Sequence, residues 1–150
     1  VRETRKLEAM HRMLARDLAA GVKPLDGIVA CDNPIDDVMR GGADMTHDAI
    51  VAAGDYYTIP FRSLVPKKIE NLLFAGRLVC ADPAAFASVR GMPQCMAMGQ
   101  AAGTAAALAM ASGTAVQALD LAQIVSSLMA QGVRGIGGEG LSHHAKAKLA

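Results

Sequence analysis

The chain has 150 residues, enough for one domain with a buried core, and 52% of them are hydrophobic although only 3% are aromatic. The chain has 15 Lys and Arg residues, which are spread along the sequence, and 14 Asp and Glu residues. The resulting net charge of +1 argues against a nucleic-acid-binding surface. Three cysteines without CxxC spacing, Cys31, Cys80 and Cys95, argue against a disulfide framework and a metal site, so we expect reduced thiols in a cytoplasmic protein.

The chain opens on VRETRKLEAMHR, a charged segment without an initiator Met or a signal-peptide pattern. We therefore expect a piece of something larger, either a C-terminal fragment or one subunit of a split protein. Residues 1–7 are compatible with a strand. Residues 8–20 place apolar side chains three and four positions apart, which predicts an amphipathic helix that ends at Gly21.

The middle of the chain predicts extended segments. Residues 28–31 form a short apolar run closed by an Asp-Asn-Pro turn, which predicts a strand. Residues 56–68 are expected to be extended because two of them precede a proline. The apolar run at 72–75 predicts a strand covered on both faces. Residues 82–93, DPAAFASVRGMP, are predicted to form an irregular loop.

Residues 92–112 carry no charge and predict a long helix. The segment is too weakly hydrophobic for a membrane span. Gly99, Gly103 and Ala107 fall on one stripe, although Gly costs about 1 kcal/mol relative to Ala inside a helix. The stripe therefore indicates that a backbone or a ligand lies against it. The alternative is an ordinary core helix rich in Ala and Met.

A second amphipathic helix is predicted within 116–133 and ends at Gly132, and a Gly-rich, then basic tail follows. The order of strand, Gly76, loop and small-residue helix indicates a ligand site, because ligands of open α/β sheets lie off the carboxyl ends of the strands. The free N–H groups of a helix start favour anionic or electron-rich atoms. Arg77 or Arg90 would meet a phosphate or a carboxylate.

Four motifs occur together within residues 57–109: Ile-Pro-Phe-Arg-Ser-Leu-Val-Pro, Asn-Leu-Leu-Phe-Ala-Gly-Arg, Ser-Val-Arg-Gly-Met-Pro and Gly-Gln-Ala-Ala-Gly-Thr-Ala-Ala. With them, this segment resembles the C-terminal signature of the FAD-dependent oxidoreductases related to the fumarate reductase and succinate dehydrogenase flavoproteins. The resemblance implies an FAD-binding Rossmann-like domain and hydride transfer between an organic substrate and the flavin.

The resemblance also implies a set of FAD contacts. Ala75 and Gly76 would pack beside the ribityl and diphosphate part of FAD. The helix start, placed at 98–103, would point its N–H groups at the pyrimidine edge of the isoalloxazine and stabilise the reduced flavin. The implied cofactor-binding residues are Ala75, Gly76, Arg77, Met98, Gly99, Gln100, Ala101, Ala102 and Gly103.

Two features depart from the family pattern. The GxGxxG fingerprint is missing, because GGEG at 137–140 follows no strand. The adenosine half of FAD would therefore be held by an N-terminal FAD-binding portion of the same enzyme, as a separate chain or a missing segment. The loop after Ala-Gly-Arg commonly carries a histidine in the family, whereas this chain has Pro83 near that place, which weakens the case for an acid/base group in this loop.

The candidate catalytic residues are Arg2, Arg5, His47 and Arg90. On a strand, Glu3 and Arg5 would share a face and form a substrate-facing cluster with Arg2, although a surface ion pair is the alternative. His47 lies in a polar segment and is a candidate acid/base group. Arg90 would either support the loop over the flavin or hold a substrate carboxylate.

We therefore expect an α/β fold: the C-terminal part of an FAD-binding Rossmann-like domain, with its closing strand and flavin-facing helix, and part of an α+β substrate domain. Residues 1–64 would belong to the substrate or cap domain, 65–133 to the FAD-binding domain and 134–150 to a flexible tail. The expected function is hydride transfer between a small-molecule substrate and FAD. The alternatives are a non-catalytic scaffold subunit or remnant that binds a partner flavoprotein, and a stand-alone helical binding domain. Oligomerisation is left open.

Overall fold

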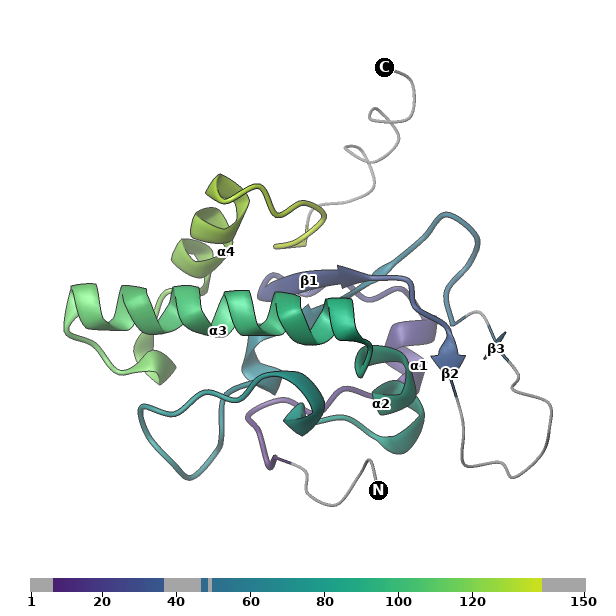
Figure 1. Cartoon of the computed structure of the whole chain (residues 1–150), viewed down its shortest axis with the longest axis horizontal. Coiled ribbons are helices and arrows are strands. Elements are labelled where there is room, and N and C mark those ends of the chain that lie inside the picture. Colours follow the sequence, from purple (N-terminus) through teal and green to yellow (C-terminus); the bar gives the residue numbers. More distant parts are fainter. Residues whose placement is uncertain (1–6, 37–46, 49, 139–150) are drawn as a thin grey trace.

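The computed structural model of the chain describes residues 7–36, 47–48 and 50–138, which form a mixed α/β fold (Figure 1). The helices and strands, in chain order, are α1 (Ala15–Ala19), β1 (Gly27–Cys31), β2 (Ile35–Asp36), β3 (His47–Asp48), β4 (Tyr57–Pro60), α2 (Pro83–Val89), α3 (Met92–Ser112) and α4 (Leu121–Ala130). Short 3₁₀ turns are η2 (Phe61–Ser63), η3 (Gly76–Leu78) and η4 (Val116–Ala118). Within these residues β1 pairs with β4 and β2 with β3, both antiparallel.

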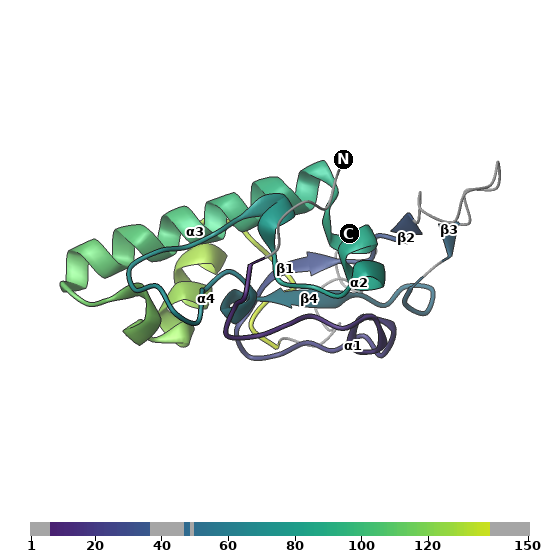
Figure 2. The same ribbon diagram turned by 90° about the horizontal axis from the view of Figure 1, so that it is seen from below.

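The β1–β4 ribbon lies at the centre of the core. Val29 pairs with Ile59 and Cys31 with Tyr57, and all four side chains are buried, as expected for β-branched and aromatic residues on a covered strand. In Figure 2 the ribbon lies between α3 on one side and α1 on the other, and contacts of α3 with β1 and of α1 with β4 agree with this view. The strand predicted at 28–31 is therefore confirmed.

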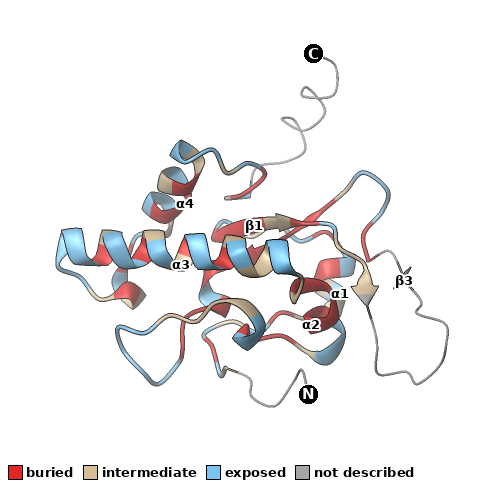
Figure 3. Cartoon of the chain, in the orientation of Figure 1, coloured by how far each residue is buried: buried red, intermediate tan, exposed pale blue. Residues whose placement is uncertain are grey.

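The long helix predicted at 92–112 is confirmed as α3. It ends at Gly113, whose φ of +66° is the left-handed conformation that glycine adopts without strain. Its inner face packs Met98, Ala101, Ala105 and Ala109 on the core. Figure 3 shows buried positions alternating with an exposed stripe along this helix. Ala on the inner face lets the helix lie close to β1, at the cost of little buried area per residue.

The helix predicted at 8–20 is wrong for most of its length. Only Ala15–Ala19 is helical, and the preceding residues are extended because their backbone bonds go to distant segments. The N–H of Met10 donates to Val65 O (2.8 Å), and that of Met13 donates to Cys80 O (2.9 Å). Tertiary hydrogen bonds have overridden a local helical periodicity.

The loop predicted at 82–93 is also wrong, since its first half is the helix α2. Asp82 is its N-cap and Pro83 its first residue, a pairing typical of helix starts. One Asp82 oxygen accepts from Ala85 N (2.8 Å), and the other accepts from Ala15 N at the start of α1 (2.9 Å). One carboxylate therefore caps two helices.

The buried strand predicted at 72–75 is not formed in the described part of the chain. Leu72 is 36% exposed, and the next three residues are only half-buried. The segment is extended and bonds to the protein through the Phe74 N–H, which donates to Leu64 O (2.9 Å). A buried strand needs partner strands at its edges, whereas β1 and β4 pair with each other and not with residues 72–75. The expected closing strand of a Rossmann-like sheet is therefore absent from this ladder.

The C-terminal helix is α4, which begins at Leu121 after the N-cap Asp120. Of the tail expected from 134 onwards, residues 135–137 are packed: Ile136 is fully buried and Gly137 N donates to Gly27 O (2.9 Å). Residues on both sides of the expected boundary at 64/65 share one hydrophobic core. The division into domains stays a prediction.

Candidate functional site

The segment 75–77 lies against the first turns of α3. Gly76 has a φ of +72°, and a side-chain carbon added there would lie 3.6 Å from Cys95 Sγ. Arg77, in the same turn, is exposed and close enough to lower the pKa of Cys95, although burial dominates and leaves that pKa raised. The structure therefore brings three of the predicted cofactor-binding residues to the beginning of the predicted flavin-facing helix.

The beginning of α3 is not where the sequence placed it. The helix starts at Met92, so the N–H groups of residues 98–103 are bonded within the helix and are not free, which corrects the expectation for them. The free N–H groups belong to the first turn. Its N-cap, Gly91, offers no side-chain acceptor, and Pro93 has no N–H. The positive end of the helix is thus the turn around Met92 and Gln94.

The predicted residues of α3 divide between two faces. Met98 and Ala101 are fully buried and pack on the core, and Ala102 is half-buried. Gly99 and Gly103 face outward, and a side-chain carbon at either position would meet no atom within 4 Å. These two glycines are therefore not required by packing within the described residues.

Gln100 is tied to the end of α4. Its Nε2 donates to Gln131 Oε1 (3.0 Å), and Gln131 Nε2 donates to Thr104 Oγ1 (3.1 Å). The exposed part of α3 between this pair and the helix start carries large apolar side chains, with Met92 77% and Met96 76% exposed. It is an uncharged surface beside the turn at 75–77.

The candidate catalytic residues are only partly located. Arg2 and Arg5 lie outside the described residues. His47 pairs with Asp36 in the β2–β3 ladder, away from α3 in Figure 1. Arg90 is the C-cap of α2 and directly precedes the N-cap of α3, and its carbonyl accepts from the Cys95 thiol (3.6 Å). Arg90 is therefore the one described candidate beside the start of α3.

A buried polar cluster next to this helix start was missed by the sequence analysis. Tyr57 Oη lies 3.0 Å from Cys31 Sγ and 2.7 Å from Ser88 Oγ, and Gln94 Nε2 donates to the same sulfur (3.2 Å). Burial, followed by the neighbouring Cys31, raises the pKa of Tyr57 far above its ordinary value, so the phenol stays protonated. These residues come from four elements, and no local motif connects them.

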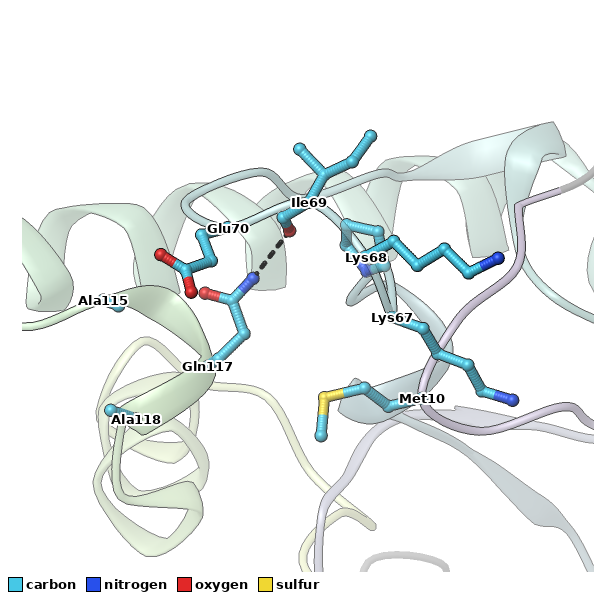
Figure 4. A pocket seen from close by; sticks show the side chains of 9 residues that line it. Met10, Lys67, Lys68, Ile69, Glu70, Ala115, Gln117 and Ala118 are labelled. Carbon is cyan, nitrogen blue, oxygen red and sulfur yellow. Dashed lines mark hydrogen bonds between the residues drawn. The ribbon is translucent and has the colours of Figure 1, made fainter.

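A separate surface groove of about 790 Å³ lies between η4 and residues 66–70 (Figure 4). Gln117 spans it, because its Nε2 donates to Ile69 O (2.9 Å) and its Oε1 accepts from Asn71 N (3.2 Å). The side chains of Lys67 and Lys68 point away from Gln117 in Figure 4. The groove contains none of the predicted FAD contacts.

Among the described residues, no helix has the length and apolar character to cross a bilayer. The same part of the chain holds no group of three or more His, Cys, Asp or Glu side chains arranged for a metal ion.

The family model described as FAD dependent oxidoreductase matches residues 1–128, more than four-fifths of the chain. No curated protein and no solved structure matched it. The matched range includes the turn at 75–77 and the whole of α3, and the cofactor of this family is FAD. The chain belongs to the FAD-dependent oxidoreductase family.

Proposed function

We propose that this chain supplies the isoalloxazine-facing part of the FAD site in an oxidoreductase related to the fumarate reductase and succinate dehydrogenase flavoproteins. One observation carries the proposal: the Gly76 turn lies against the start of α3, beside an open, uncharged face that includes Gly99 and Gly103. Such a face suits a flat aromatic ring, and a glycine turn allows a close approach of the ribityl chain. When bound, FAD would supply hydride transfer with a small organic substrate.

The protein groups at this site have distinct tasks. The uncapped first turn of α3 would stabilise negative charge on the pyrimidine edge of the reduced ring, because a helix N-terminus carries a partial positive charge. Arg77 is exposed beside that turn and would meet the diphosphate. Arg90, with Arg2 and Arg5, would hold a carboxylate of the substrate. These roles rest on the residue types and on the family.

The adenosine half of FAD requires another part of the enzyme. The chain carries no GxGxxG fingerprint, so we propose that an N-terminal FAD-binding portion, on a separate chain or a missing segment, holds that half. The half-exposed segment at 72–75 and the open face of α3 are compatible with such a neighbour. The described chain would then contact the flavin ring, the ribityl chain and one phosphate.

This division of labour gives a direct test. In an NMR titration of the ¹⁵N-labelled chain, FMN and FAD at millimolar concentration should shift the amide signals of Gly76, Met92 and Gly99, whereas AMP should not. FMN contains only the half of FAD assigned to this chain, and AMP contains only the other half.

A pair of variants localises the effect. Gly99→Leu should abolish the FMN-induced shifts because it fills the open face, and it should leave the fold intact because Leu is a better helix former than Gly. Ala111→Leu adds similar bulk at an exposed position near the other end of α3 and should change nothing. Equal responses to FMN and AMP, or no response to either flavin, would refute the proposed site. The second result would favour a non-catalytic scaffold subunit.

A further inference from the structure

The buried polar cluster beside the start of α3 forms a continuous path across four elements. It runs from Gln94 in the first turn of α3 to Cys31 at the end of β1, to Tyr57 at the start of β4, and to Ser88 in α2. Ser88 Oγ donates to the backbone carbonyl of Asn33. Cys31, Tyr57 and Ser88 are 5%, 1% and 0% exposed, so water does not compete for these bonds.

The Cys31 sulfur is the centre of this path, because it accepts hydrogen bonds from two sides. Tyr57 Oη donates to Cys31 Sγ (3.0 Å), and Gln94 Nε2 donates to the same sulfur (3.2 Å). Tyr57 Oη also lies 2.7 Å from Ser88 Oγ, which donates to the Asn33 carbonyl. The sulfur therefore joins the first turn of α3 to the buried phenol of β4.

Among the described residues, the side-chain amide of Gln94 has no hydrogen-bond partner other than Cys31. Gln94 Oε1 is buried without a hydrogen bond and lies against Gly91, at the position where a side-chain carbon would stand. The amide of Gln94 is therefore held through its nitrogen on Cys31 alone. Next to it, Cys95 N donates to Gly91 O (3.0 Å) and closes the first turn of α3. A loss of the sulfur acceptor would release this turn.

We propose that Gln94, Cys31, Tyr57 and Ser88 form a hydrogen-bond network, centred on the Cys31 sulfur, that holds the first turn of α3 on the β1–β4 ribbon. The four side chains are positioning residues, since none has to touch a ligand. Their importance for the flavin rests on the proposed function, in which that first turn faces the ring.

Three cysteine variants test the proposal without any ligand. Cys31→Ala removes the acceptor of both bonds, and Cys31→Ser keeps an acceptor at this position. Cys80→Ala is the matched control, because it removes a buried thiol that makes no side-chain hydrogen bond to any described residue. By NMR-detected hydrogen exchange, Cys31→Ala should speed the exchange of the Cys95 amide about fivefold, the factor for one lost hydrogen bond. Cys31→Ser and Cys80→Ala should stay near the wild-type rate.

If Cys31→Ala does not fold, Gln94→Leu replaces it, because it removes only the first donor of the path and keeps the bulk of the side chain. Equal exchange rates at Cys95 in Cys31→Ala, Cys80→Ala and the wild type would overturn the proposal. So would a serine variant that exchanges as fast as the alanine variant, since simple packing would then account for the effect.

A flavin titration of the same variants separates this proposal from the proposed function. Cys31→Ala should weaken FMN binding by up to about fivefold relative to the wild type, with affinity restored in Cys31→Ser and unchanged in Cys80→Ala. Faster exchange at Cys95 without any change in FMN affinity would overturn the link to the flavin. Failure of the wild-type chain to bind FMN would refute the proposed function alone, because the exchange comparison still decides whether the path holds α3.

Discussion

The shared cap at Asp82 makes a quantitative prediction about stability. The carboxylate accepts from Ala85 N through one oxygen and from Ala15 N through the other. The N-cap position of α1 is Leu14, which provides no side-chain bond of its own, so α1 depends on Asp82 for this contact. Removal of the carboxylate therefore affects two helices that are far apart in the sequence.

The magnitude follows from the number of bonds. An N-cap contributes about 1 kcal/mol, so Asp82→Ala should lower the free energy of unfolding by about 2 kcal/mol. Asp82→Asn keeps one acceptor oxygen and should cost about 1 kcal/mol. Asp120 caps only α4, through Ala122 N (3.0 Å), so Asp120→Ala should also cost about 1 kcal/mol.

Urea unfolding curves followed by circular dichroism measure these differences. With an m-value of about 2 kcal/mol/M, the midpoint should fall by about 1 M in Asp82→Ala and by about 0.5 M in Asp82→Asn and Asp120→Ala. If Asp82→Ala and Asp120→Ala lose the same stability, or if Asp82→Asn matches the wild type, the double cap is refuted.

Four further substitutions can be checked with the same unfolding curves. Asp26→Asn removes the charge from a buried carboxylate that lies 2.8 Å from the half-exposed guanidinium of Arg62. The free energy of unfolding should fall by about 2 kcal/mol, less than for a fully buried pair. A loss below about 0.5 kcal/mol would contradict this reasoning. The pKa of Asp55 lies below the ordinary 3.8, mainly because Lys23 donates a hydrogen bond to its carboxylate. The stability that this pair contributes should therefore be complete above about pH 4, and it should be lost as the pH falls through the lowered pKa. Asp55→Asn should flatten that part of the pH profile, and an unchanged profile would exclude the pair as its source. Gly99→Ala should raise the free energy of unfolding by up to about 1 kcal/mol, because the added methyl group meets no atom and Ala is the better helix former. Gly113→Ala should lower it by about 1 kcal/mol, because the φ of Gly113 is +66°. Effects of the same sign in the two variants would contradict the reasoning.

Local patterns predicted the elements that depend mainly on neighbouring residues. The apolar run at 28–31 and the helix at 92–112 were located to within a residue, because β-branched residues and a long Ala-rich stretch have strong local preferences. The second amphipathic helix was also found, and Asp120 fixes its start. For the helix at 83–89 the signal was available and overlooked: Asp82 followed by Pro83 is a helix-start pair.

Other predictions were wrong because distant segments decide them. The apolar spacing in residues 8–20 is helical, yet backbone bonds to Val65 and Cys80 hold its first half extended. Residues 72–75 have the composition of a buried strand, but a strand is formed only where a partner edge is offered.

The candidate site shows the same division. The sequence by itself determined the family and the small-residue helix, because motifs and helix propensity are local properties. Only the tertiary structure decided that Gly76 begins a turn that lies against Cys95, that Gly99 faces outward while Met98 faces the core, and that the first turn of α3 is tied to Cys31. The physical reason is that the direction of a side chain and its hydrogen-bond partners depend on where the helix begins and on which strand it packs against. Neither is encoded in the spacing of the residues concerned.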